Sequence, residues 1–379
     1  MNRTPIPGTP VTVTTVALLA VTLACSDPVP TAPYSERAEV EPQMLINGVN
    51  DFGHDATAAI MVYDDPNQTG VSGWRSFCTG VLVHQRVIQT AGHCIQFMQQ
   101  QLDAGTMKAV WISFQHDPRA HFNADPALHN PASGGWYEVE SLRNNPDNID
   151  FVQLRQSPPE EVLAVWGKFH DTGAIVLKKP VKGIKPVEMA RRPGSVKRLL
   201  RASQCEHPNA KWRNRFCKLL DVSYGLQEFP PTADPPEQVR HSALLRYKGI
   251  DAKFIATFDD PPGGDFGANC LGDSGSPVWL LKPNGKDRIV IAISSSPADP
   301  FGPPCATGAL QYRTDTRSHQ RFIRGVIESV RCQSNRHSSR LPAGNAASGS
   351  VDRENSASHF RDPRKRRCRL GEDRTPLGG

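Results

Sequence analysis

A serine and a histidine with neighbours suited to nucleophilic catalysis lie far apart in this chain of 379 residues. Residues 270–277 (CLGDSGSP) place Ser274 on a glycine-flanked turn, and residues 90–94 (TAGHC) place His93 beside a cysteine. A serine hydroxyl is a poor nucleophile at neutral pH unless a base removes its proton, and imidazole titrates near neutrality. Either run alone is also typical of a tight turn or a packed core histidine. Their joint occurrence indicates that His93 is the base for Ser274.

An acidic residue ahead of a short apolar run supplies a third candidate. Asp171 lies just before the apolar part of residues 170–177 (HDTGAIVL), and this apolar part predicts a buried strand. A carboxylate at that point can orient an imidazole and stabilise the imidazolium that forms during attack. Asp147 and Asp150 compete for this role, and a strand-entry aspartate that caps a turn is the alternative. The longer apolar run after Asp171 favours Asp171.

The order His93, Asp171, Ser274, each in its local context, resembles the chymotrypsin/trypsin family of serine endopeptidases, in the form that bacteria secrete. Subtilisins and α/β-hydrolases have other orders. The resemblance covers about residues 45–332. It implies an all-β fold of two six-stranded antiparallel β-barrels, with a catalytic cleft between them and a C-terminal helix. It also implies that the backbone N–H groups of Gly272 and Ser274 form the oxyanion hole.

The same resemblance implies a substrate pocket. Its base corresponds to Ala268, two residues before Cys270, and its walls correspond to Ser294, Ser295, Ser296 and Gly308. Alanine cannot pair with a basic side chain, and a buried unpaired cation is strongly disfavoured. An uncharged P1 residue is therefore expected, although Asp265 would supply a charge if the loop folds otherwise.

Activation is a further implication of the family. Cleavage before Leu45 would free an α-amino group that pairs with Asp273, the residue before the nucleophile. Leu45 stands where the family has isoleucine, and Met44 stands where a basic residue is usual, so self-cleavage by a trypsin-like activity is not expected. The alternative is that residues 45–51 are an ordinary first strand.

Nine cysteines favour an oxidising compartment, because removal of Cys25 leaves an even number. The resemblance implies two disulfides, Cys78–Cys94 and Cys270–Cys305. Proximity in the sequence suggests Cys205–Cys217. Cys332 and Cys368 stay unassigned.

Composition divides the chain into four parts. Residues 1–24 are expected to be a signal peptide, 25–44 a tether or propeptide, 45–332 the protease domain and 333–379 a disordered basic tail. The run before Cys25 resembles a bacterial lipobox with Thr22 in place of an aliphatic residue, which leaves a lipid anchor at Cys25 and plain secretion both open. The protein is thus expected in the cell envelope or outside the cell.

The partners expected from the sequence are few. A polypeptide substrate is implied by the family, and the chain is expected to be a monomer. The basic cluster at residues 361–369 fits contact with a polyanion, but a solvated or processed tail is the favoured interpretation. No cofactor is expected, and no metal is expected because the histidines and cysteines lack metal-ligand spacing. A catalytically silent homologue that acts as a binding module is the alternative function.

Periodicity predicts the main elements. Residues 77–89 are predicted to form one half-buried strand, and 108–114, 242–247, 253–257 and 288–295 further strands. Residues 219–225 resemble the strand that opens the family's second barrel. Residues 116–168 are expected to be elaborated surface loops. Apolar residues at helical spacing predict a late helix over 320–330.

Overall fold

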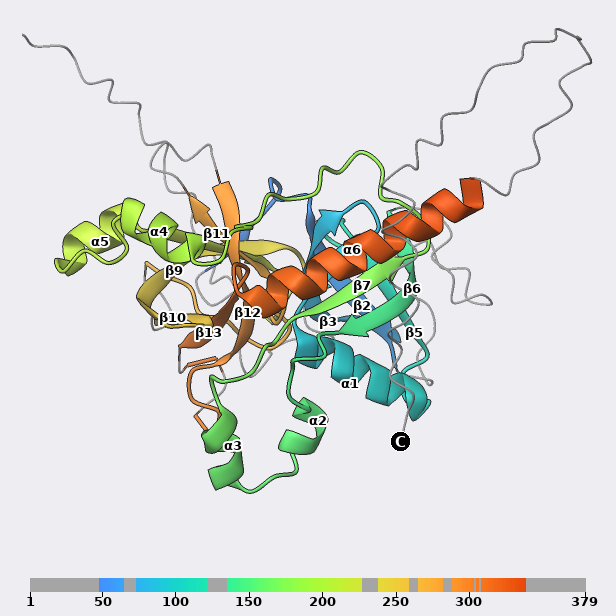
Figure 1. The fold of residues 1–379 in the computed structure, drawn as a ribbon, viewed down its shortest axis with the longest axis horizontal. Helices are drawn as coiled ribbons and strands as arrows, with labels where there is room; N and C mark the ends of the chain where they lie inside the picture. The colour runs from blue at the N-terminus through green and yellow to red at the C-terminus, as the bar shows by residue number, and fades with distance from the viewer. Residues whose placement is uncertain are drawn as a thin grey trace, which may run out of the picture. The chain divides into compact units, whose positions relative to one another are not determined.

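Antiparallel strands, most of them buried along their length, close into a first β-barrel in the computed structural model (Figure 1). The structure describes residues 48–64, 73–120, 135–226, 238–258, 265–281, 288–302, 305–306 and 308–338. The strands of this barrel pair in the order β2-β3-β4-β7-β6-β5, and β5 closes it by pairing with β2. They are β2 (Thr57–Tyr63), β3 (Trp74–His84), β4 (Val87–Thr90), β5 (Ala109–Ser113), β6 (Trp136–Asn144) and β7 (Gly173–Leu177).

A second set of six strands closes in the same way. The pairing runs β8-β9-β10-β13-β12-β11 and returns to β8, and every pair is antiparallel. The strands are β8 (Lys218–Ser223), β9 (His241–Ile250), β10 (Phe254–Phe258), β11 (Pro277–Leu281), β12 (Arg288–Pro297) and β13 (Ala309–Arg313), and a short β1 (Val49–Asn50) is added at β9. The predicted two six-stranded barrels are therefore confirmed.

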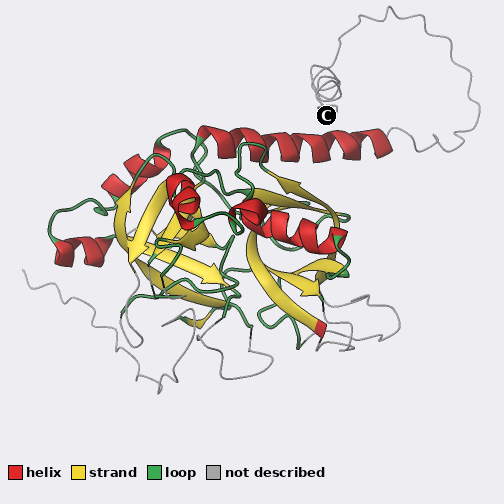
Figure 2. Ribbon diagram, turned by 90° about the horizontal axis from the view of Figure 1, so that it is seen from below, coloured by secondary structure: helices red, strands yellow, loops and turns green. Residues whose placement is uncertain are grey.

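Helices flank the barrels (Figure 2). They are α1 (Gly92–Asp103), α2 (Phe151–Leu154), α3 (Pro159–Val165), α4 (Ser195–Ala202), α5 (Ala210–Phe216) and α6 (Arg317–Ser338). The last helix is the one predicted over 320–330. It buries Ile323, Val326 and Val330 in the core of the first barrel, which explains why apolar residues recur there at helical spacing.

Two expectations about the elements were wrong, and one helix was not predicted. The single strand expected over 77–89 is a hairpin, because β3 and β4 pair across a two-residue turn whose sequence, Gln85-Arg86, has no glycine or proline to mark it. Residues 116–168 are not all surface loop, since β6 is a full barrel strand and α2 and α3 follow it. The helix α1 was not foreseen; it buries Cys94, Ile95 and Met98 on one face.

Buried hydrogen bonds from Arg240 join the two barrels. Arg240, just before β9, donates from Nη1 to the Phe114 carbonyl oxygen (3.0 Å) and the Tyr224 hydroxyl (3.2 Å), and from Nε to the Asp51 carbonyl oxygen (3.1 Å). The Tyr224 hydroxyl in turn donates to the Gln115 carbonyl oxygen at 2.6 Å. Phe114 and Gln115 directly follow β5, so these bonds attach the second barrel to the first.

Among the described residues, no helix combines the length and the apolar character needed to cross a bilayer.

Replacing the buried guanidinium tests this connection. We expect Arg240→Met to lower the free energy of unfolding by about 3–5 kcal/mol, because it leaves several buried acceptors without a donor. Urea unfolding measures the change. Lys178→Met is the matched control: its ion pair with Glu138 is exposed, so its loss should cost less than about 1 kcal/mol. Equal effects of the two substitutions would contradict the connection.

Candidate active site

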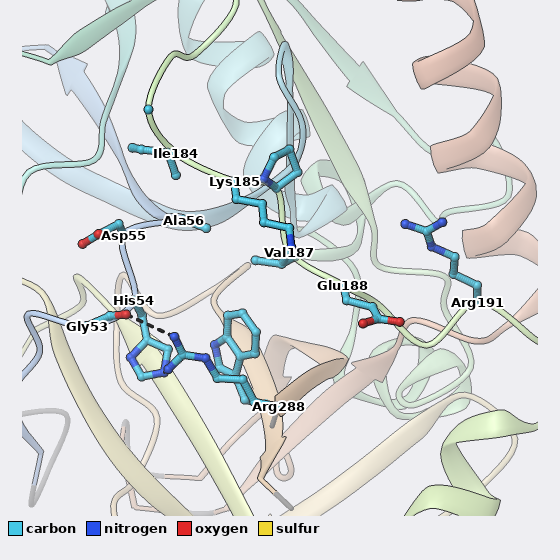
Figure 3. A pocket seen from close by; sticks show the side chains of 13 residues that line it. Gly53, His54, Asp55, Ala56, Ile184, Lys185, Val187, Glu188, Arg191 and Arg288 are labelled. Atoms are coloured by element: carbon cyan, nitrogen blue, oxygen red, sulfur yellow. Dashed lines mark hydrogen bonds between the residues drawn. The ribbon is translucent and has the colours of Figure 1, made fainter. Parts of the chain in front are cut away.

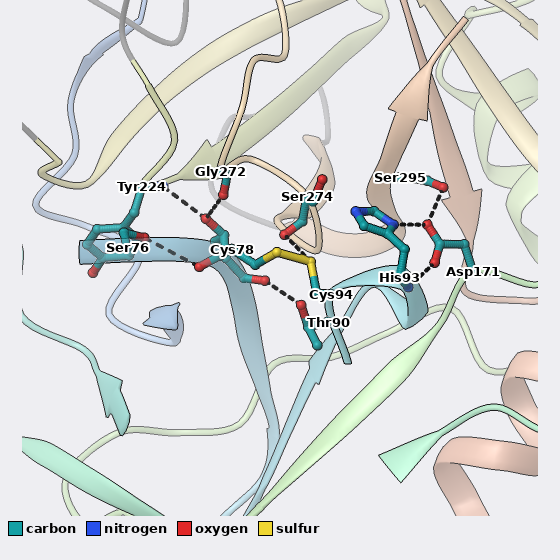
Figure 4. Close-up of a disulfide and its surroundings, with 11 residues drawn as sticks. Ser76, Cys78, Thr90, His93, Cys94, Asp171, Tyr224, Gly272, Ser274 and Ser295 are labelled. Carbon is teal, nitrogen blue, oxygen red and sulfur yellow. Dashed lines mark hydrogen bonds and ion pairs between the residues drawn. A yellow bond between two sulfur atoms is a disulfide. The ribbon is translucent and has the colours of Figure 1, made fainter. Parts of the chain in front are cut away.

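Strand pairing in the first barrel brings His93 and Asp171 together. Thr90, the last residue of β4, pairs with Gly173, the first of β7. His93 lies three residues after the one and Asp171 two residues before the other, so the two side chains leave the same end of the barrel. His93 Nδ1 lies 2.7 Å from Asp171 Oδ2, and the His93 backbone N–H donates to Oδ1 at 2.8 Å (Figure 4).

A third donor comes from the second barrel. The Ser295 hydroxyl, on β12, donates to Asp171 Oδ2 at 2.6 Å. The Asp171 side chain is completely buried. Burial alone would raise the pKa of this carboxyl, but the His93 charge and the hydrogen bonds from His93 and Ser295 hold the pKa below its usual value. Asp171 is therefore an ionised acceptor locked in one orientation.

The competing aspartates make other contacts. Asp150 caps α2 by accepting the Gln153 backbone N–H at 3.0 Å. Asp147 accepts from the Ser318 hydroxyl and from Arg321, each at 2.6 Å, near the start of α6. Neither carboxylate contacts His93, so the histidine's acidic partner is Asp171, as the apolar run after it predicted.

Backbone contacts hold the Ser274 turn against the first barrel. The Thr79 N–H of β3 donates to the Ser274 carbonyl oxygen at 2.9 Å, and Cys94 Sγ lies 3.7 Å from that same oxygen. Because Cys94 follows His93, this contact places the histidine and the serine in one neighbourhood. In Figure 4 the His93 ring points from Asp171 toward Ser274.

Glycines on both sides of Asp273-Ser274 are required by the turn. Gly272 and Gly275 have φ of +95° and +87°, the left-handed region that disfavours side chains. A Cβ on Gly275 would lie 2.3 Å from the Thr79 carbonyl oxygen, so a side chain would push the turn off β3. No described group accepts a hydrogen bond from the backbone N–H of Gly272 or of Ser274. The two N–H groups expected for an oxyanion hole are therefore not engaged elsewhere in the described part of the chain.

A pocket of about 240 Å³ lies beside Ser274. Its described lining includes the four wall residues expected from the sequence: Ser294, Ser295, Ser296 and Gly308. Ala268, the expected base, is fully buried and is not among the lining residues, whereas its neighbour Asn269 is. The described lining therefore does not support Ala268 as the base of the pocket.

The side chain of Asn269 is fixed on two sides. Its Nδ2 donates to the Asp221 carboxylate, and its Oδ1 accepts from Gln311 Nε2 at 2.7 Å. No sequence signal pointed to this cluster, because Asp221 and Gln311 lie on separate strands that only the folded barrel brings together. The role of Ser295 as a partner of Asp171 was missed for the same reason.

Asp273, the residue before Ser274, and Asp221 form a pair of buried carboxyl groups. Asp273 accepts the backbone N–H groups of Cys270 (2.7 Å) and Gly225 (3.1 Å). Burial, and then the neighbouring Asp221 charge, raise the pKa of Asp273 to about 8; burial raises the pKa of Asp221 to about 7. Leu45, the expected partner of Asp273, lies outside the described residues.

Three disulfides join pairs of described cysteines: Cys78–Cys94, Cys205–Cys217 and Cys270–Cys305. All three pairings expected from the sequence are thus confirmed. The first links β3 to α1 directly beside His93. The third links the turn that carries Ser274 to the wall of the pocket, since Cys270 and Cys305 both line it.

A second histidine–aspartate pair is formed by His54 and Asp51, and His54 lines a separate cavity of about 640 Å³ (Figure 3). His54 Nδ1 lies 2.6 Å from Asp51 Oδ2, but Arg288 donates to His54 Nε2 and also to the Gly53 carbonyl oxygen. Because the guanidinium takes the position where a nucleophile's hydroxyl would stand, this pair is not arranged as a base for catalysis.

One group of described residues brings potential metal-ligand atoms close together: Cys78, His93 and Cys94. The two sulfurs are bonded to each other as a disulfide, so they are not thiolate ligands.

No protein-family model and no curated protein matches this chain. Among solved structures it is similar to neuropsin, described as a serine protease expressed in the limbic system of mouse brain, with 17% identity and a TM-score of 0.45. The match covers 74% of this chain and 99% of the neuropsin chain. A match at this level supports neither fold nor function; the fold stated above rests on the strand pairing of this chain.

The Asp171 contact can be tested through the reactivity of Ser274. We expect Asp171→Asn to slow the labelling of Ser274 by a fluorophosphonate by about 10²–10⁴-fold, because His93 loses the acceptor that orients it. Ser295→Ala removes one donor of three and should have a smaller effect. Asp147→Asn is the control and should label at the parental rate. Equal rates for Asp171→Asn and Asp147→Asn would contradict the assignment.

The Asp221–Asp273 pair predicts a dependence of stability on pH. Both pKa values are raised above the usual 3.8, so the native state binds more protons than the unfolded state between about pH 4 and pH 8. Stability should therefore fall as pH rises through this window, by up to about 1.4 kcal/mol per pH unit for each proton involved. We expect Asp221→Asn to flatten the curve measured by urea unfolding.

Asp147→Asn serves as the control for this measurement. Hydrogen bonds from Ser318 and Arg321 lower the pKa of Asp147, so its titration lies below the window. The free energy of unfolding of this variant, plotted against pH, should run parallel to that of the parent. Parallel curves for the parent and Asp221→Asn would contradict a raised pKa in the pair.

Proposed function

We propose that this protein is an exported serine endopeptidase that cleaves peptide bonds through Ser274, His93 and Asp171. The observation that carries the proposal is the chain of contacts at the junction of the barrels. A buried, ionised Asp171 holds the His93 ring, and that ring points toward a serine on a turn anchored to the same barrel.

The mechanism follows from these positions. Ser274 Oγ attacks the scissile carbonyl while His93 Nε2 takes its proton, and Asp171 accepts the Nδ1 hydrogen and stabilises the imidazolium. The N–H groups of Gly272 and Ser274 bind the oxyanion of the tetrahedral intermediate. His93 then gives its proton to the leaving amine, and an acyl-enzyme remains on Ser274. Water, deprotonated by His93, hydrolyses this ester.

An uncharged P1 side chain fits the pocket best. None of its described lining residues is acidic, and Asn269, the polar group in the lining with the longest side chain, is neutral. A lysine or arginine would be buried there without a counter-charge, which is strongly disfavoured. Asp265 is exposed and does not line the pocket.

Export and activation belong to the same proposal. Three disulfides are typical of proteins that fold in an oxidising compartment. We propose that cleavage before Leu45 supplies an amine to the buried Asp273, for which the described residues provide backbone donors but no cation. Such an amine would lower the raised pKa of Asp273 and keep the Asp273 carboxylate ionised. A lipid on Cys25 would retain the enzyme at the cell envelope.

Covalent labelling separates an enzyme from a silent homologue. The exported protein would be characterised by N-terminal sequencing and intact mass, which report any acyl group and whether Leu45 is the terminus. We expect the Leu45-terminated form to be labelled by a fluorophosphonate and to hydrolyse unstructured protein, and Ser274→Ala to do neither. A Leu45-terminated protein that does neither is a binding module and not a protease.

A panel of chromogenic peptides that differ only at P1 tests the pocket on the same preparation. We expect kcat/KM for apolar or small neutral P1 residues to exceed that for lysine and arginine by about 100-fold or more, the order expected for an unpaired buried cation. Cleavage mainly after lysine or arginine would contradict the assigned pocket but not the nucleophile.

A further inference from the structure

The segment between the two barrels is far more basic than the rest of the chain. Residues 191–218 contain nine lysines and arginines and one glutamate, a net charge of +8, whereas the whole chain has +6. The segment folds as the helical hairpin of α4 and α5, joined by Cys205–Cys217. Figure 1 shows α4 beside the second barrel and α5 beyond it. We refer to residues 191–218 as the basic hairpin.

One face of α4 fixes the basic hairpin to the barrel. Val196 and Leu200 are fully buried in the core of the second barrel, and Cys205 and Cys217 are buried with them. The Val196 backbone N–H donates to the buried Asp315 carboxylate at 2.9 Å. The hairpin is therefore held as part of the fold, and its charges occupy defined positions.

The charges of the basic hairpin have almost no partners. Arg201 pairs with Glu206 at 2.6 Å, and this is the one ion pair that a described residue of the hairpin makes. Lys197, Arg198 and Lys211 are exposed and make no ion pair with any described residue. A concentration of unpaired cations costs self-repulsion, so it is expected where an anionic surface neutralises it.

Aromatic side chains accompany the cations on α5. Lys211, Trp212, Arg215 and Phe216 follow the spacing of one helix face. Trp212 is 47% exposed. The centroid of its ring lies 4.8 Å from that of the Phe216 ring and 5.8 Å from that of the His207 ring. The Arg215 guanidinium lies 5.4 Å from the Phe216 ring. No residue of α5 is buried, so this helix contributes little to the core and presents its aromatic groups at the surface.

We propose that the basic hairpin docks the protein on an anionic lipid surface, with Lys197, Arg198 and Lys211 bound to headgroups and Trp212 at the interface. Exposed tryptophan between cations is typical of helices that lie in the headgroup region of a bilayer. A single-stranded nucleic acid would instead need a free ring face on which a base can stack, and the Trp212 ring already packs against two other rings. None of the hairpin residues lines the pocket beside Ser274, so the docking contacts and the pocket use different residues.

Vesicle binding tests the proposal. We would measure sedimentation of the full chain with phosphatidylcholine vesicles that do or do not contain phosphatidylglycerol. The chain should bind the anionic vesicles and not the neutral ones, and binding should weaken as salt is raised. The triple variant Lys197→Gln, Arg198→Gln, Lys211→Gln should bind about 100-fold more weakly, since each charge near an anionic membrane contributes about fivefold.

Two further variants make the result specific. The matched control, Lys179→Gln, Lys182→Gln, Lys185→Gln, removes the same charge from exposed lysines outside the hairpin and should bind nearly as well as the parent. Trp212→Ala should bind about tenfold more weakly even at raised salt, because it removes an apolar contact and not a charge. The rate of fluorophosphonate labelling and the Tm confirm that each variant is folded.

Two outcomes would overturn the proposal. Equal losses in the two triple variants would mean that net charge alone drives binding. Tighter binding of duplex DNA or heparin than of anionic vesicles, with the same dependence on Lys197, Arg198 and Lys211, would assign the basic hairpin to a polyanion instead of a membrane.

Discussion

The buried charge of Asp171 is the constraint on which the rest of the site depends. An isolated carboxylate in the interior is very costly, so it persists only where donors surround it. Here two donors come from His93 on the first barrel and one from Ser295 on the second. The carboxylate therefore needs both barrels in place, and the orientation of the His93 ring depends on their assembly.

The same junction is reinforced on either side of Asp171. Thr79 of β3 donates its backbone N–H to the Ser274 carbonyl oxygen, and its hydroxyl donates to the Gly272 carbonyl oxygen at 2.9 Å. Arg240 and Tyr224 form further bonds between the barrels. The turn that carries Ser274 is thus fastened to the barrel that carries His93. Loops alone would not hold the two groups to the fraction of an ångström that proton transfer needs.

Local sequence around His93, Asp171 and Ser274 predicted that these three side chains act together. The family resemblance predicted the two barrels and the disulfides Cys78–Cys94 and Cys270–Cys305, and proximity predicted Cys205–Cys217. Ser274 lies between glycines, Asp171 precedes an apolar run and the cysteines occur at positions that the family resemblance or proximity pairs. The sequence did not reveal which residues of separate strands and loops the folded barrels bring together. Asn269 contacts Asp221 and Gln311, and Ser295 contacts Asp171, yet each of these residues is of an ordinary type for its own strand or loop. The division of residues 77–89 into two strands was also missed, because its turn lacks glycine and proline.

The crystal structure of a phosphonate adduct tests most directly whether these groups converge on one reacting atom. The account predicts a bond from Ser274 Oγ to phosphorus, with the phosphonyl oxygen about 3 Å from the N–H groups of Gly272 and Ser274. It also predicts His93 Nε2 within about 3 Å of an oxygen on phosphorus, and Nδ1 still on Asp171. An adduct in which His93 lies away from phosphorus, or in which the phosphonyl oxygen points to solvent, would contradict the account.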